Sequence, residues 1–338
     1  MARIIEKHAP DAVGKVRDLV SGGDTGPKKA GAAMSLGFLP KDKAGATERE
    51  ALAKGLGASE VEVREASANA LARVGEAGNA PDLTKAAQDA DANVQIAALR
   101  AISNIRPDNA DTIKALGEMI ADEAETPGGP SKKVLTGPLA HLVREYAVDA
   151  LGNIANPAAV PYLLRSRRDM MRNVRIASSA AIQKCHKAKP DETRDAALAV
   201  LRDEKRKTDD RIGAALCIGD TGDASQGKPL VLRLIDENPP LVLKDQDPAV
   251  RIAICQALGN LKAKRLTVVE RLIQAMSDEN EREAVRNAAY EALKSTAGAE
   301  VPENAQFKGS DPKDKRDAAV KWWQDWFGAE KANLKDEA

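Results

Sequence analysis

The chain has 338 residues, and its 51 Lys plus Arg residues balance its 51 Asp plus Glu residues, so the formal net charge is zero. This balance excludes a global attraction to nucleic acid or to an anionic membrane surface. Aromatic residues make up only 3% of the chain, against 43% hydrophobic residues in all. A single large core ordinarily uses more aromatic rings. Packing by Ala, Leu, Ile and Val therefore indicates thin layers of helices in close contact.

No targeting, membrane or redox signal stands out. The chain has no apolar run near the ~18 residues of a membrane span, and its first residues lack the apolar core of a signal peptide. We therefore expect a cytoplasmic protein. Cys185, Cys217 and Cys255 lie far apart and form no CxxC motif. They are expected to be small buried apolar residues.

One helical pattern recurs along the chain. Counted from its first residue, each copy has apolar or small residues at offsets 0, 3, 4, 7, 8 and 11, which trace one stripe of an α-helix. Small residues at offsets 3, 4 and 7 allow a neighbouring helix to approach closely. Clear copies begin at Val63, Val94, Val143, Val174, Val250 and Val285, and looser copies begin at Lys28 and Asp210.

A second amphipathic stretch precedes most copies, so each repeat is expected to be a hairpin of helix A followed by helix B. Neither helix can bury its stripe alone, and the hairpins must stack. The sequence therefore predicts an all-α fold, a right-handed α-solenoid of about eight hairpins. The predicted A helices cover 46–57, 81–89, 157–165, 194–202, 228–235 and 266–277.

The spacing of the copies also predicts the domain organisation. Residues 1–300 are expected to form the solenoid, with an insertion loop at about 122–137 and a smaller insertion at about 237–246. Residues 301–338 would form a linker, a cap helix and a frayed tail. The three tryptophans fall on stripe positions of an odd ninth copy that begins at Lys315, which indicates a cap over the end of the stack. An outward-facing aromatic cage for a ligand is the alternative.

Asp247–Leu261 and Val143–Leu163 resemble HEAT repeats, most closely the short class named after phycobilisome lyase subunits. The resemblance covers residues of about 10 to 300 and implies that the B helices line a concave face. It does not specify a function, because this class includes lyases, hydroxylases, transport factors and scaffolds.

The family usually pairs an acidic residue before helix B with an Arg four residues later. Asp247–Arg251 and Glu60–Arg64 have this spacing. Three further arginines at this position, Arg144, Arg175 and Arg211, have no acidic residue four positions earlier, so they are expected either to bond to the adjacent repeat or to reach a partner.

No catalytic or metal-binding motif appears. A HEAT-repeat hydroxylase binds iron through repeated His-Glu pairs, whereas His8, His141 and His186 are followed by Ala, Leu and Lys. Gly22–Lys29 lacks the spacing of a phosphate-binding loop. We therefore expect no cofactor, no metal and no enzyme activity. A lyase-like role in handling a tetrapyrrole chromophore remains an alternative.

A basic block occupies residues 165–189 and contains one acidic residue, Asp169. It could bind an acidic protein segment or a nucleic-acid backbone, or it could be a solvated turn with arginines bonded inside the stack. The block spans both ends of one hairpin rather than a continuous stripe, which favours an acidic protein over a nucleic acid. Its basic residues are Arg165, Arg167, Arg168, Arg172, Arg175, Lys184, Lys187 and Lys189.

A line of aliphatic residues at offset 2 is the second surface feature: Ile96, Ile176, Ile212 and Ile252. These side chains could border an apolar groove on the concave face, or they could pack against the next hairpin. Taken together, the sequence predicts a non-catalytic scaffold that binds a protein partner through its concave or inter-helix surface.

Overall fold

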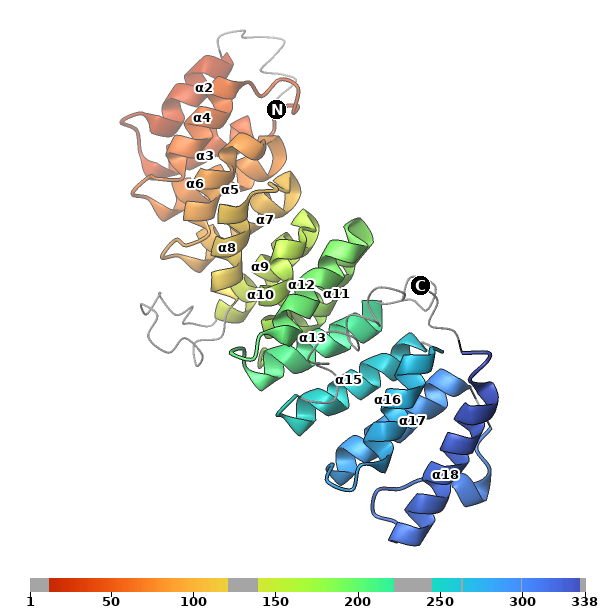
Figure 1. Ribbon diagram of the computed structural model, residues 1–338. Coiled ribbons are helices and arrows are strands. Elements are labelled where there is room, and N and C mark those ends of the chain that lie inside the picture. The colour runs from red at the N-terminus through yellow and green to blue at the C-terminus, as the bar shows by residue number, and fades with distance from the viewer. Residues whose placement is uncertain (1–11, 121–138, 222–244, 263, 299, 335–338) are drawn as a thin grey trace. The chain divides into compact units, whose positions relative to one another are not determined.

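A computed structural model describes residues 12–120, 139–221, 245–262, 264–298 and 300–334, and every regular element in these ranges is a helix (Figure 1). The predicted all-α fold is confirmed. The insertion predicted at 122–137 lies outside the described residues, as does that at 237–246 except for its last two positions. Within the described ranges, no helix has the length and apolar character needed to cross a bilayer. The chain divides into two compact units, Met1–Lys189 and Pro190–Ala338.

The described residues of unit 1 (Met1–Lys189) form five hairpins, and each B helix packs against the B helix of the next hairpin. The A helices form a second layer, because each packs on the B helix of its own hairpin. The A helices are α2 (Ala12–Ser21), α4 (Ala46–Gly55), α6 (Ala80–Ala86), α8 (Ala110–Met119) and α10 (Val160–Ser166). The B helices are α3 (Gly26–Leu36), α5 (Val61–Val74), α7 (Ala92–Ile105), α9 (Ala140–Ile154) and α11 (Arg172–Ala188). Short 3-10 turns at Ala77–Asn79 and Pro157–Ala159 precede α6 and α10.

Unit 2 (Pro190–Ala338) has the same two layers. Its B helices α13, α15 and α17 pack in order, with α12 on α13 and α16 on α17. The A helix predicted at 228–235 lies outside the described residues. The helices are α12 (Pro190–Arg202), α13 (Thr208–Thr221), α15 (Pro248–Leu261), α16 (Leu266–Ser277), α17 (Glu283–Ala297) and α18 (Lys313–Glu330), with a 3-10 turn at Glu303–Ala305.

The predicted stripe forms the core between the layers. All six stripe positions counted from Val63 are buried, and so are all six counted from Val250. Several copies have a glycine at offset 9, and this glycine lets the neighbouring B helix approach its backbone closely. A Cβ atom on Gly152 would lie 2.8 Å from the Cα of Ala181. The sequence thus provides small residues on both sides of these helix junctions.

The predicted acidic–Arg pairs four residues apart are not formed. Arg64 instead binds the next turn of the stack, with its Nε and Nη2 atoms 2.8 and 3.0 Å from the two carboxylate oxygens of Asp89. Arg251 binds Glu281 through the same two nitrogens at 2.7 Å. An extended Arg side chain reaches the neighbouring repeat, where a bidentate fork is more favourable than an exposed pair within one helix.

The alternative expectation for the remaining arginines, bonding to the adjacent repeat, is confirmed for two of them. Arg144 binds Asp169 through Nε and Nη2 at 2.6 and 3.1 Å, and Arg211 pairs with Asp245. Arg175 donates from Nη1 to the carbonyls of Asp169 and Met170, at 2.7 and 2.9 Å. These arginines therefore hold the turns between A and B helices together.

The predicted cap helix is α18, but it is not a ninth B helix. It packs against the A helix α16, so it takes the place of the next A helix. Trp323 is fully buried and lies edge-on to Tyr290, with ring centroids 6.5 Å apart. Of the expected stripe, Lys315 and Ala318 are exposed, while Trp322 and Trp326 are half-buried against Trp323. The described part of the expected frayed tail, residues 328–334, is instead structured, because the helix continues to Glu330 and Leu334 is buried.

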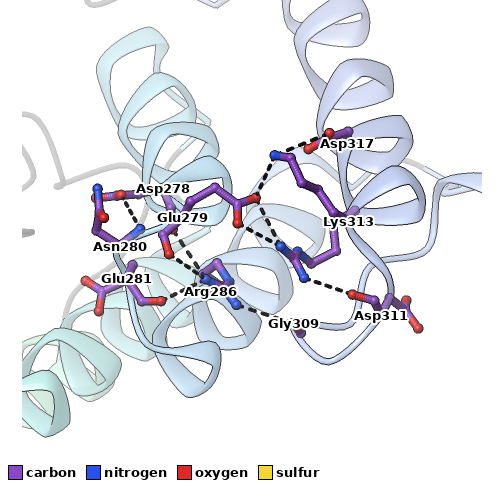
Figure 2. A network of polar contacts seen from close by, with 10 residues as sticks. Asp278, Glu279, Asn280, Glu281, Arg286, Gly309, Asp311, Lys313 and Asp317 are labelled. Atoms are coloured by element: carbon purple, nitrogen blue, oxygen red, sulfur yellow. Dashed lines mark hydrogen bonds and ion pairs between the residues drawn. The ribbon is translucent and has the colours of Figure 1, made fainter.

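A polar network fixes the start of α18 to the turn before α17 (Figure 2). Arg316 binds both carboxylate oxygens of Glu279, at 3.1 and 2.8 Å, and donates to the Asp311 carbonyl at 2.9 Å. Lys313 lies 3.4 Å from the same Glu279. Arg286 donates to the carbonyls of Glu281 and Gly309, at 2.8 and 3.3 Å. The network repeats the arginine-to-turn arrangement of the other hairpins.

Candidate partner-binding groove

A groove of about 610 Å³ crosses the exposed face of the B helices in unit 1. It is lined by residues from five successive B helices: α3, α5, α7, α9 and α11. Most of the lining side chains are polar or charged. The lining residues are Met34, Asn69, Ala72, Arg73, Arg100, Ser103, Asn104, Tyr146, Asp149, Asn153 and Lys184.

The helical repeat explains why these residues share one face. Most of them occupy offsets 6, 9 and 10 of their copies, which lie on the side of the helix turned away from the buried stripe at offsets 0, 4 and 8. Asn104, Asn153 and Lys184 all stand at offset 10 of consecutive copies. Stacking of the hairpins places these positions in a row, although they are 31 to 49 residues apart in the sequence.

Side-chain hydrogen bonds link the helices that form the groove. Asn104 Nδ2 donates to the Ala72 carbonyl at 2.9 Å, and Asn153 Nδ2 donates to Ser103 Oγ at 2.6 Å. Lys184 Nζ donates to Asn153 Oδ1 at 2.8 Å. Because each bond joins two neighbouring B helices, the polar groups are held in position before any ligand binds.

Two arginines of the groove lie on aromatic rings. The Cζ atom of Arg73 is 4.5 Å from the ring centroid of Phe38, and that of Arg100 is 4.8 Å from the ring centroid of Tyr146. Arg100 Nη2 also donates to the Tyr146 hydroxyl at 2.6 Å. Stacking on a ring restricts a guanidinium while leaving N–H groups at its edge for a ligand.

Asp149 is the one acidic residue of the groove, and it is half-buried on α9. Burial raises the pKa of its carboxyl group above the ordinary value, and the positive charge of Lys184 partly opposes the increase. The carboxylate therefore lies in a poorly solvated place beside a cation. Such a group can accept hydrogen bonds from a bound segment, but it repels a second negative charge.

Metal-binding clusters and reactive thiols were the remaining candidate sites among the described residues. These residues contain no cluster of three or more His, Cys, Asp or Glu residues able to hold a metal ion. All three cysteines are buried, as expected. Burial raises the pKa of the Cys185 thiol to about 11 and that of Cys255 to about 12, so both stay protonated at neutral pH.

The structure separates the basic block into two parts. Lys184 lies in the groove, whereas the turn that ends α10 and the first residue of α11 carry Arg165, Arg167, Arg168 and Arg172. Lys187, in the last turn of α11, is exposed. As described above, Arg175 binds carbonyls of its own turn. The block thus spans both ends of the hairpin, as the sequence predicts.

The aliphatic line at offset 2 does not border this groove. Ile176 is 54% exposed, and Ile96 and Ile212 are half-buried. Ile252 lines a separate hollow of about 620 Å³ in unit 2, beside Arg211 and Arg282. Most of the lining residues missed by the sequence analysis stand at offsets 6, 9 and 10, two or three residues after the small stripe residues at offsets 4 and 7. Inspection of offsets 6 and 10 for residues able to donate hydrogen bonds would have found them.

Comparison with known families matches two repeat models to the chain. The model of HEAT repeats matches residues 49–127 and 240–320, and the model of the PBS lyase HEAT-like repeat matches residues 143–167. A search of curated proteins finds no matching sequence.

Solved structures give weaker likenesses. The complex of CpcE and CpcF of phycocyanin lyase from Nostoc sp. PCC7120 is 17% identical with a TM-score of 0.42, covering 84% of this chain and 94% of that one. A mutant of Kap121p is 12% identical with a TM-score of 0.49, covering 87% of this chain and 34% of that one. An engineered protein is 18% identical with a TM-score of 0.32, covering 92% and 98%.

These TM-scores carry no argument about function, and the assignment rests on the repeats themselves. The stretches that the two repeat models match contain helices of both units, in whole or in large part, namely α4–α8 and α9–α10 in unit 1 and α15–α17 in unit 2. The chain therefore belongs to the HEAT-repeat family.

Proposed function

We propose that the chain is a non-catalytic scaffold that holds a protein segment in the groove on the B helices of unit 1. The observation that supports this most strongly is the row of hydrogen-bonding side chains over four successive helices, α5, α7, α9 and α11, which Met34 of α3 extends at one end. Arg and Tyr, which are enriched among energetically important interface residues, are both present there. Lys184 connects this groove with the basic block identified in the sequence.

The dimensions of the groove suit an extended peptide. Packed helices lie ~8 to 10 Å apart, so the four gaps between five B helices span ~32 to 40 Å. An extended chain rises ~3.3 Å per residue, and ~11 residues would cover this distance. Pockets for small molecules are mostly enclosed and apolar, whereas this groove is partly open to solvent and lined by amide, guanidinium, hydroxyl and ammonium groups.

Site-specific crosslinking tests the proposal. In an Asn104→Cys variant the new thiol lies in the groove, and a maleimide–benzophenone reagent should modify it selectively because the native thiols are buried. Lys85→Cys, on the exposed surface of the A helix α6, is the matched control. We expect irradiation in an extract of the native source to crosslink a protein from the groove and not from α6. Equal crosslinking from both positions, or none from the groove, would contradict the proposal.

A further inference from the structure

The groove carries the features of a site for an acidic ligand. Resting on the function proposed above, we infer that its occupant is an extended protein segment with regularly spaced Asp or Glu residues. Arg73 and Arg100 would bind the first two carboxylates and Lys184 the last.

The charges of the groove are complementary to such a segment. The lining residues include three basic side chains, Arg73, Arg100 and Lys184, and a single acidic side chain, Asp149. In a chain with equal numbers of basic and acidic residues, this local excess of positive charge is a property of the groove rather than of the whole surface. Complementary charges of this kind select the partner and accelerate its association.

The two groove arginines differ from the arginines of the turns. Arg64 and Arg251 have both edges occupied by carboxylates and carbonyls of the stack. Within the described residues, by contrast, neither Arg73 nor Arg100 forms an ion pair, and each is placed by an aromatic ring. A stacked guanidinium keeps a fork of N–H donors that matches a carboxylate, so these side chains are preorganised for an acidic group from outside.

The repeat geometry sets the spacing of the acidic residues. Arg73 and Arg100 lie on neighbouring B helices ~8 to 10 Å apart and about one turn apart along them, at offsets 10 and 6. The resulting separation of ~10 to 12 Å equals about three residues of extended chain. Lys184 lies two helices beyond Arg100, about six residues further along. Asp149 stands on the helix between them, where a carboxylate of the ligand would be repelled. The inferred pattern is acidic at positions one, four and ten, and neutral or basic at position seven.

The same geometry disfavours a nucleic acid. A phosphate backbone carries a negative charge at every nucleotide, and it cannot leave the position over Asp149 uncharged. A peptide can place a Ser, Asn or Lys residue there, and those side chains can donate a hydrogen bond to the Asp149 carboxylate. The alternation of positive and negative groups along the groove therefore favours a polypeptide.

Synthetic peptides provide the test. The probe is a fluorescein-labelled twelve-residue peptide with Glu at positions one, four and ten and Ser or Ala elsewhere. An isomer with the three Glu residues at positions one, two and three has the same composition and charge. We expect the full-length chain to bind the spaced peptide at least about tenfold more tightly than the clustered isomer by fluorescence anisotropy. A fourth Glu at position seven should weaken binding, because it would face Asp149.

Charge reversal identifies the residues involved. Arg73→Glu with Arg100→Glu should weaken binding of the spaced peptide about a hundredfold, or about tenfold for each lost charge-assisted contact. Lys54→Glu with Lys85→Glu changes the net charge equally on the A-helix layer of the same unit, and it should leave the Kd within about twofold. Arg73→Gln with Arg100→Gln gives a second measure if the reversed variant does not fold.

The outcomes separate this inference from the proposed function. Equal loss in the A-layer control, or equal affinity for the clustered isomer, would show general charge attraction and overturn the inference. If the spaced peptide does not bind but the Asn104→Cys crosslink still captures a protein, the partner is not acidic and the proposed function stands. If both fail, the proposed function fails as well. Preferential binding of single-stranded DNA over the spaced peptide would also overturn the inference.

Discussion

The B helices of the two units share their buried side and differ on their exposed side. In both units most of the stripe residues are buried, and arginines at the start of the helices bind carboxylates of the next turn. On the exposed face of unit 1, three side-chain hydrogen bonds join successive helices. On the corresponding face of unit 2, the described part of the chain shows a bond of this kind from Ser295 of α17 to the Gly259 carbonyl of α15, while Lys294 pairs with Glu291 of its own helix.

This difference separates features that are needed to stack the hairpins from features that the stack carries in addition. A feature present in both units, such as the arginine-to-turn pairing, is explained by the need to hold hairpins together. Among the described residues, the row of groove side chains lies on unit 1, so stacking alone does not account for it. The same comparison isolates a feature of unit 2, the tryptophan cluster of α18, whose expected role is to cover the end of the stack.

The largest expected effect concerns that cluster. Trp323→Ala should lower the free energy of unfolding by about 3 kcal/mol or more, because it leaves a cavity beside Tyr290 in a fully buried site. Hydrogen exchange should accelerate in α16, α17 and α18, while unit 1 keeps its protection.

Trp323→Phe is the matched control. The indole Nε1 of Trp323 is buried without a hydrogen-bond partner, so the smaller ring loses volume but no polar contact. The loss of stability should be clearly smaller than for Ala. Equal losses for both substitutions, or faster exchange in unit 1, would show that the ring is not a local cap.

The sequence predicts the repeated parts of this fold well. A stripe such as that from Val63 is visible because the same small and aliphatic residues recur at the same offsets, and burial follows directly from that periodicity. Partners across the stack are harder to predict. Arg64 and Glu60 have the spacing of a helix pair, but the bidentate contact with Asp89, 25 residues away, replaces it. The orientation of α18 likewise depends on packing that the stripe alone does not specify.

The groove could not be found from a motif. Its polar residues differ from repeat to repeat: Arg73, Asn104, Asn153 and Lys184 all occupy the same offset. A search of the sequence for runs of charge finds the basic block at 165–189, and a search for similar residues at one offset finds the isoleucines. Only the stacking of helices places these unlike side chains side by side, so their common function becomes apparent from the structure.

An effect of intermediate size tests whether the turn arginines are structural and the groove arginines are not. Arg64→Ala in unit 1 and Arg251→Ala in unit 2 should each cost about 2 kcal/mol of stability, because each leaves a largely buried carboxylate without its partner. Arg100→Ala should change the free energy of unfolding by less than about 0.5 kcal/mol, since that side chain is exposed. Urea denaturation of the three variants makes the comparison. A cost for Arg100→Ala similar to that for Arg64→Ala would show that the groove is structural.

The smallest expected effect concerns Asp149. Burial raises its pKa in the folded chain, so the folded state binds a proton over a pH range in which the unfolded state has lost it. The folded state therefore loses stability as the pH rises from the ordinary Asp pKa to the raised one, and this loss of stability persists at neutral pH.

Asp149→Asn should give a small increase in Tm at neutral pH that disappears below the ordinary Asp range, where both side chains are neutral. Lys184→Met should instead lower the Tm at neutral pH, because it removes the positive charge that partly opposes the rise in the Asp149 pKa. An increase in Tm for Asp149→Asn that is the same at all pH values would assign the effect to packing rather than to desolvation of the carboxylate.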